Sequence, residues 1–149
     1  MYQDIVVGTD GSETAAKAVG RAAGLARAYG ARLRIVTAYA PVSAARIQEE
    51  LSRVPADQRF MVNLERQAEQ LLADATAQAR GEGEPLEVTT HPLQGDPAEA
   101  LIRVAEQYGS DLIVVGNKGM VGARRFLLGS VPNKVTHHAP CDVLVVRTT

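Results

Sequence analysis

The chain has 149 residues, which corresponds to one domain spanning residues 1–149 that can bury a core of its own. No apolar run approaches the roughly 18 residues of a membrane-spanning helix, and the first residues have no secretion-signal pattern, so we expect a cytoplasmic protein without a membrane partner. The balance of 16 basic and 17 acidic residues, the single cysteine and the absence of tryptophan disfavour a nucleic-acid binder, a disulfide scaffold and a zinc ribbon.

The first part of the chain alternates strand and helix patterns. Residues 5–8 form a short apolar run that predicts a buried strand. Ser12 is a candidate N-cap for a helix over residues 13–29, and Gly30 is placed to end that helix. A second buried strand is predicted over residues 33–38. The predicted buried stripe of the helix consists of small residues: Ala15, Val19, Ala22, Ala23 and Ala26.

The middle of the chain is predicted to contain a loop, a long helix and an edge strand. Residues 41–55 have no strong pattern, and a short helix is predicted within them over 44–51. Apolar residues then recur at spacings of three and four, which predicts a helix over 58–80. Residues 86–93 interleave polar and apolar side chains and include Pro92, a pattern typical of a strand at the edge of a sheet. The predicted buried residues of the helix are Met61, Leu64, Ala68, Leu71, Ala75 and Ala79.

The last part of the chain completes the fold. Asp96, Pro97 and Glu99 supply a capping carboxylate, a proline at the first helical position and a glutamate two residues later, and Gly109 ends this helix. Residues 112–115 and 143–146 predict buried strands, with a helix between them over residues 130–138. Strands that alternate with helices pair in parallel through right-handed crossovers, so the sequence predicts an open doubly wound α/β fold with helices on both faces of the sheet.

Ligands of such sheets bind beyond the carboxyl ends of the strands, where the first candidate group lies. The first strand is followed by Gly8-Thr9-Asp10-Gly11-Ser12, which brings a carboxylate and a hydroxyl to a helix N-terminus. Asp10 also suits a turn in which Gly11 takes a positive φ, and we favour this structural interpretation over a functional one.

A stronger candidate follows the fourth predicted strand. Gly116-Asn117-Lys118-Gly119 is followed nine residues later by Gly129-Ser130 at the start of a helix. Glycines let the backbone approach an anion, Ser130 offers a hydroxyl, and a helix dipole favours negative charge at its N-terminus. The sequence therefore predicts a phosphate cradle. The stretch is basic and free of acids, which fits a local anion site and a solvated basic face equally well; its basic residues are Lys118, Arg124, Arg125 and Lys134.

The spacing Gly-x2-Gly-x9-Gly-Ser, with Val7 to Ser12 and the final stretch from His138 to Arg147, resembles the nucleotide-binding branch of the universal stress protein family. The resemblance covers essentially the whole chain. It implies a five-stranded parallel sheet in the order 3-2-1-4-5, and ATP or cyclic AMP as the ligand. Carried over position by position, it implies nucleotide binding by Thr9, Asp10, Ala38, Val115, Gly116, Asn117, Gly119, Gly129, Ser130 and Val131.

The resemblance also implies a mode of action. Asn117 and Pro132 replace small hydroxyl residues of many members, as in a subgroup that binds cyclic AMP. The expected function is nucleotide binding in a stress response without efficient turnover, because the cradle has no evident general base, nucleophile or carboxylate cluster for Mg²⁺. Mg²⁺ or Mn²⁺ would accompany ATP on its phosphates. The alternatives are a slow ATP hydrolase of the same superfamily and a dimeric interaction module that needs no nucleotide.

The remaining candidate residues have structural interpretations. His137 and His138 are adjacent on a helix and point about 100° apart, so they cannot chelate one ion, and no metal site is predicted. His91 is too isolated to nominate as a ligand, and Cys141 is predicted to be a buried thiol.

The last predicted strand suggests a homodimer. In the order that the resemblance implies, this strand lies at the edge of the sheet. Its run Val143, Leu144, Val145 and Val146 contains no lysine or proline, the residues with which monomers usually protect such an edge. We therefore expect the strand to pair with its copy across a two-fold axis.

Overall fold

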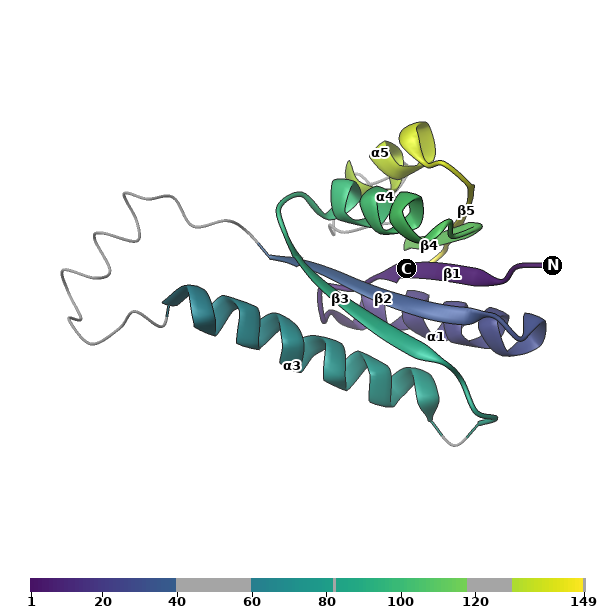
Figure 1. The fold of residues 1–149 in the computed structure, drawn as a ribbon, viewed down its shortest axis with the longest axis horizontal. Coiled ribbons are helices and arrows are strands. Elements are labelled where there is room, and N and C mark those ends of the chain that lie inside the picture. The colour runs from purple at the N-terminus through teal and green to yellow at the C-terminus, as the bar shows by residue number, and fades with distance from the viewer. Residues whose placement is uncertain (40–59, 82, 118–129, 149) are drawn as a thin grey trace.

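The computed structural model describes residues 1–39, 60–81, 83–117 and 130–148. Strands and helices alternate in the predicted order (Figure 1). The predicted short helix over 44–51 lies outside the described residues, as do Gly119 and Gly129. The elements are β1 Asp4–Gly8, α1 Glu13–Tyr29, β2 Arg32–Tyr39, α3 Phe60–Arg80, β3 Val88–Gln94, α4 Pro97–Tyr108, β4 Leu112–Gly116, α5 Ser130–His138 and β5 Asp142–Val146.

The five strands form one parallel sheet in the order β3-β2-β1-β4-β5. This confirms the predicted doubly wound fold. β1 is the central strand: the chain moves from it toward β2 and β3, then crosses back to β4 and β5 on the other side. The strand order therefore reverses between β1 and β4, which is where open α/β sheets bind their ligands.

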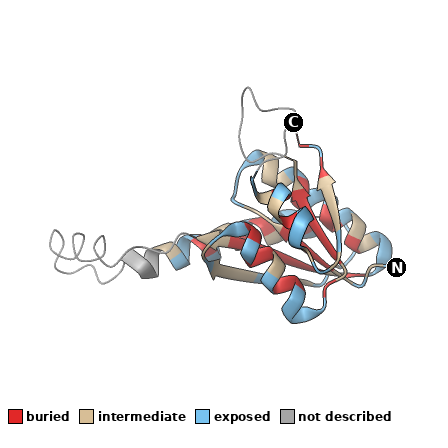
Figure 2. Cartoon of the chain, turned by 90° about the horizontal axis from the view of Figure 1, so that it is seen from above, coloured by how far each residue is buried: buried red, intermediate tan, exposed pale blue. Residues whose placement is uncertain are grey.

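The core consists of two apolar layers, one on each face of the sheet. Figure 1 shows α1 and α3 on one face and α4 and α5 on the other, and Figure 2 shows buried residues concentrated along the strands and the inward faces of the helices. Ile5 and Val7 pack in the first layer and Val6 in the second, and all three are fully buried. Successive side chains point to opposite faces, which is why a strand covered on both sides is apolar throughout.

Three residues predicted to be buried in the helices are only half-buried, namely Ala15, Leu64 and Leu71, and the side chain of Met61 lies outside the described residues. In α1, Ala18 is buried in place of Ala15, which is half-buried. In α3, Leu72 is 1% exposed and Leu71 is only half-buried, because Leu71 packs against the loop after β1 instead of the sheet. Spacing alone allowed either leucine to face the core.

The outer strand β3 pairs only with β2 in the described sheet, so its predicted edge position is confirmed. Its limits are corrected from 86–93 to Val88–Gln94. Leu86 precedes the strand, although its side chain still packs against the first core layer. Among the described residues, no helix has the length and apolar character to cross a membrane.

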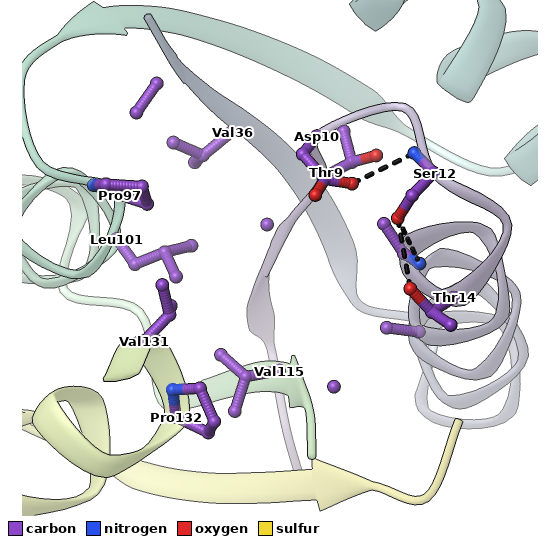
Figure 3. A pocket seen from close by; sticks show the side chains of 15 residues that line it. Thr9, Asp10, Ser12, Thr14, Val36, Pro97, Leu101, Val115, Val131 and Pro132 are labelled. Atoms are coloured by element: carbon purple, nitrogen blue, oxygen red, sulfur yellow. Dashed lines mark hydrogen bonds between the residues drawn. The ribbon is translucent and has the colours of Figure 1, made fainter. Parts of the chain in front are cut away.

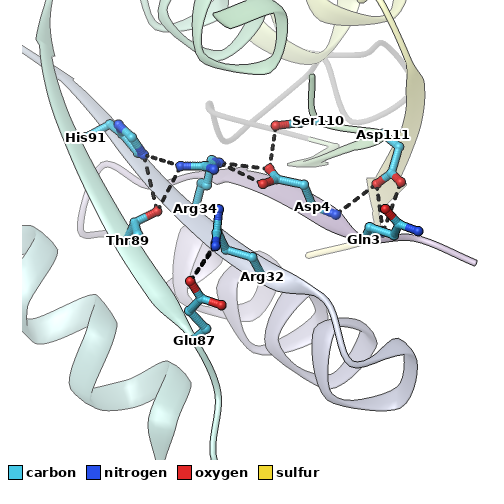
Figure 4. Close-up of polar contacts among 9 residues, drawn as sticks. All are labelled: Gln3, Asp4, Arg32, Arg34, Glu87, Thr89, His91, Ser110 and Asp111. Atoms are coloured by element: carbon cyan, nitrogen blue, oxygen red, sulfur yellow. Dashed lines mark hydrogen bonds and ion pairs between the residues drawn. The ribbon is translucent and has the colours of Figure 1, made fainter. Parts of the chain in front are cut away.

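A polar cluster lies inside the second layer, toward the amino ends of the strands (Figure 4). Arg34 of β2 is 5% exposed, and its Nε donates to both carboxylate oxygens of Asp4, at 2.8 and 3.0 Å. Its guanidinium carbon lies 3.8 Å from the ring centroid of Tyr108. Ser110 donates its hydroxyl to Asp4 Oδ1 at 2.6 Å. A charge buried in this way is tolerated because it is paired, hydrogen-bonded and stacked on an aromatic ring.

Candidate functional site

A cavity opens at the carboxyl ends of β1, β2 and β4, at the point where the strand order reverses (Figure 3). The start of α1 forms one wall, and α4 and α5 form the opposite wall. Six of the predicted nucleotide-binding residues line the cavity: Thr9, Asp10, Ala38, Val115, Gly116 and Val131. The other described residues that line it are Gly8, Ser12, Thr14, Ala15, Ala18, Val36, Pro97, Leu101 and Pro132.

The loop after β1 is held by hydrogen bonds between its own residues. Asp10 Oδ1 accepts from the Ser12 backbone N–H at 2.9 Å, and Thr9 Oγ1 accepts from the Gly11 N–H at 3.1 Å. Ser12 Oγ accepts from the Ala15 N–H at 3.2 Å, which confirms Ser12 as the N-cap of α1. The structural interpretation of Asp10 is thus confirmed, and its exposed side chain also lines the cavity.

Gly11 is required by the shape of this loop. It adopts a φ of 82°, which side-chain-bearing residues rarely adopt. A Cβ atom at this position would lie 2.9 Å from Leu71 Cδ1 of α3. The half-buried Leu71 therefore packs on the loop that carries Thr9 and Asp10 and helps to fix its position.

The turn after β4 is fixed by the end of the chain. The Asn117 N–H donates to the Val146 carbonyl at 2.8 Å. Asn117 Oδ1 accepts from the Thr148 N–H at 2.9 Å and from the Thr148 hydroxyl at 3.0 Å. The predicted ligand-binding side chain of Asn117 therefore has a structural partner, and Asn117 itself is not among the residues lining the cavity. Thr148 was missed in the sequence because it belongs to no motif.

Three helix N-termini border the cavity. Ser12 caps α1, and Asp96 caps α4 by accepting from the Glu99 N–H at 3.0 Å. α5 begins at Ser130, whose side chain is exposed beside the lining residue Val131. The N-terminus of a helix attracts anions through its dipole and its first N–H groups, so the start of α5 suits a phosphate.

Lys134 has carboxylate partners on α4. Its Nζ lies 3.3 Å from Asp96 Oδ2 and 3.1 Å from Glu99 Oε1. The pKa of Asp96 is lowered mainly by the N–H of Glu99, and the pKa of Lys134 is raised by Glu99 and Asp96, so these charges persist at neutral pH. Lys134 therefore joins α5 to α4. The other predicted basic residues, Lys118, Arg124 and Arg125, lie outside the described residues.

The remaining candidates have no ligand-binding arrangement. Cys141 is half-buried where a buried residue was predicted, and burial raises its pKa to about 11, which keeps it a protonated thiol at neutral pH. His137 Nδ1 donates to the Asn133 carbonyl at 2.7 Å within α5. No group of three or more histidine, cysteine or carboxylate side chains that could hold a metal ion occurs in the part of the chain that the structure describes.

Comparisons with known proteins agree with this fold. The profile of the universal stress protein family matches residues 1–147. Universal stress protein Rv1636 of Mycobacterium tuberculosis is 39% identical over 151 residues, covering 99% of this chain and 98% of that protein. A universal stress protein of Thermus aquaticus is 39% identical over 147 residues, covering 99% and 100%. The crystal structure of a universal stress protein in complex with cAMP is 35% identical, with a TM-score of 0.73 and coverage of 99% and 98%. The chain belongs to the universal stress protein family.

Proposed function

We propose that this protein binds an adenine nucleotide in the cavity between β1 and β4 and acts through the bound nucleotide in a stress response. The observation that carries the proposal is the position of the cavity: it lies at the reversal of strand order and is lined by six residues that the family resemblance assigns to nucleotide binding. The similarity to a family member solved with cAMP supports an adenine nucleotide as the ligand.

The two sides of the cavity suit the two ends of such a ligand. Thr9, Asp10 and Ala38 offer polar groups and a small side chain for the nucleoside, with Val36 and Leu101 as apolar walls. Gly116 and the start of α5 suit the phosphate, because a glycine allows close approach and a helix N-terminus favours an anion.

Cyclic AMP is the nucleotide that we expect to bind best. Asp10 is the charged residue among the described residues lining the cavity, and its carboxylate repels further negative charge. Pro132, in the first turn of α5, has no N–H to offer a phosphate. Both features favour a ligand with one singly charged phosphate over the polyphosphate of ATP.

We further propose that the ligand is bound and not efficiently turned over. The described residues that line the cavity include no histidine, lysine or cysteine, and the one carboxylate, Asp10, accepts a hydrogen bond from the Ser12 N–H. A phosphoryl-transfer site usually combines a positioned base with cations or a metal on the phosphates.

Calorimetric titration with cyclic AMP, AMP, ADP and ATP, each with and without Mg²⁺, tests the proposal. We expect cyclic AMP to bind most tightly, with little dependence on Mg²⁺ and less dependence on salt than ATP. Chromatography of the nucleotide after prolonged incubation should recover it unchanged. Steady release of ADP from ATP would support the hydrolase alternative, and the absence of any nucleotide binding would support the interaction module.

We also propose that the protein is a homodimer through β5. In the described sheet β5 pairs with β4 on one side, and its other edge has no partner strand. Leu144 packs against one core layer and Val143 and Val145 against the other, so the strand is apolar on both faces. A second copy of the strand would satisfy the N–H and C=O groups of this edge.

A further inference from the structure

Thr148, two residues beyond β5, is buried and fully bonded. It is 2% exposed, its N–H and hydroxyl both donate to Asn117 Oδ1, and its carbonyl accepts from Lys17 Nζ at 3.1 Å. Burying a polar residue is costly unless its hydrogen bonds are made, so this arrangement holds the segment in one place.

Thr148 lies directly behind a wall of the nucleotide cavity. Gly116 lines the cavity, and a Cβ atom on Gly116 would lie 3.2 Å from Thr148 Cγ2. Asn117, the next residue, is bonded to Thr148 through its side chain and to Val146 through its backbone. The turn that follows β4 is therefore fixed on two sides by the chain that leaves β5.

Thr148 also contacts the wall that α1 forms. Lys17 belongs to α1, and its sequence neighbours Thr14, Ala15 and Ala18 line the cavity. Because Lys17 donates to Thr148 and Thr148 donates to Asn117, one residue ties the α1 wall to the β4 wall. The distance between these walls is a dimension that a bound nucleotide must match.

The two donors of Thr148 also set the orientation of the Asn117 amide. A backbone N–H can only donate, so the amide atom that faces Thr148 must be the oxygen. The NH₂ group of Asn117 lies in the same amide plane on the other side of Cγ, and its two hydrogens are the donors of this side chain.

We propose that Thr148 is a positioning residue of the nucleotide site: it fixes the turn at Gly116 and Asn117 and holds this turn at its distance from α1. The inference rests on the proposed function, because it assumes that the cavity binds an adenine nucleotide. Thr148 itself does not line the cavity, so it acts on affinity through Gly116 and Asn117.

The test compares Thr148→Val and Thr148→Ser with the wild type in calorimetric titrations with cyclic AMP and ATP. Valine keeps the branched shape but loses the hydroxyl, so Asn117 Oδ1 keeps one donor of two. For whichever of the two nucleotides the wild type binds more tightly, we expect the Kd of Thr148→Val to be about three- to tenfold higher, which is the effect of losing one hydrogen bond. Serine keeps the hydroxyl and should bind within about twofold of the wild type. Lys17→Met, which breaks the link to α1, should also weaken binding.

Thr136→Val is the matched control. Its hydroxyl is exposed and donates to the Asn133 carbonyl within α5, away from the cavity wall. Urea unfolding at the temperature of the titrations establishes that each variant is folded under those conditions. A purely structural role would lower the urea midpoint of Thr148→Val without changing its Kd, and that result would overturn the inference. If the wild type binds no adenine nucleotide, the proposed function itself fails; if the wild type binds and all Thr148 and Lys17 variants bind equally well, only the inference fails.

Discussion

His91 is a half-buried titratable residue whose surroundings favour its neutral form (Figure 4). Its Nε2 lies 3.5 Å from Arg34 Nη1 and 3.4 Å from Thr89 Oγ1. Because arginine can only donate, Nε2 must accept, and a protonated imidazole has no acceptor to offer. Burial first, and then Arg34, lower the pKa of His91, while Asp4 opposes them.

This environment predicts a loss of stability in mild acid. With the pKa lowered in the folded state, the unfolded chain binds the proton more readily at pH values below the ordinary histidine pKa of 6.5. The contribution of His91 is therefore complete above this value and is lost as the pH falls from it through the folded-state pKa. We expect His91→Gln, which has no proton to gain, to reduce the fall in urea midpoint between about pH 7.5 and pH 5.

His137→Gln serves as the control, because His137 is exposed on α5 and hydrogen-bonded within that helix. The urea midpoint of His137→Gln should change with pH as that of the wild type does. The explanation is wrong if His91→Gln and the wild type lose stability in parallel over this range.

Ser130 provides a test of the predicted phosphate side. Its exposed hydroxyl stands at the first position of α5, where it can donate to an anion held by the helix N-terminus. We expect Ser130→Val to weaken nucleotide binding by about 0.5 to 3 kcal/mol, depending on whether the hydroxyl meets a charged oxygen, and to leave the urea midpoint nearly unchanged. Calorimetry measures the first and urea unfolding the second. Equal affinity of Ser130→Val and the wild type for every adenine nucleotide would contradict this placement.

At the scale of elements, the start of α4 combines a helix cap with an interhelical ion pair. Asp96 accepts from the Glu99 N–H and also contacts Lys134 of α5. Asp96→Ala should lower the free energy of unfolding by about 1 kcal/mol, mostly through the lost cap. Asp96→Asn keeps an acceptor oxygen and should lose much less, because exposed ion pairs contribute little. Urea unfolding compares the two variants, and an equal loss in both would assign the effect to charge instead of capping.

The elements themselves were predictable where their signals are local. The caps of α1, Ser12 and Gly30, and those of α4, Asp96 and Gly109, could be recognised in the sequence, because capping depends on residues within one helical turn. Contacts between distant segments gave no such signal. The bond between Lys17 and Thr148 joins residues 131 positions apart, and the choice of Leu72 over Leu71 for the core depends on how α3 lies against the loop after β1. The glycine motif indicated where the cavity lies, but the residues that hold the cavity walls in place, Lys17 and Thr148, lie outside the motif.

At the scale of the whole molecule, the edge of β5 that has no partner strand in the described sheet predicts the oligomeric state. Sedimentation equilibrium of the wild type at micromolar concentration should give twice the chain mass of 15.9 kDa. Val145→Pro removes an N–H and places a ring in the strand, so it should yield monomer or aggregate. Val145→Ala keeps the N–H and should remain a dimer. A wild-type species near 15.9 kDa would rule the dimer out under these conditions.

The strand order has a consequence for the order of folding. β3, β2 and β1 all come from residues 4–94, whereas β4 and β5 come from residues 112–146, so the cavity between β1 and β4 exists only after the second group has docked on the first. A nucleotide that contacts both groups of strands binds only the chain in which β4 and β5 have already packed against β1. If the proposed nucleotide binds, its presence should slow the separation of β4 and β5 from the rest of the sheet and protect the chain from proteolysis.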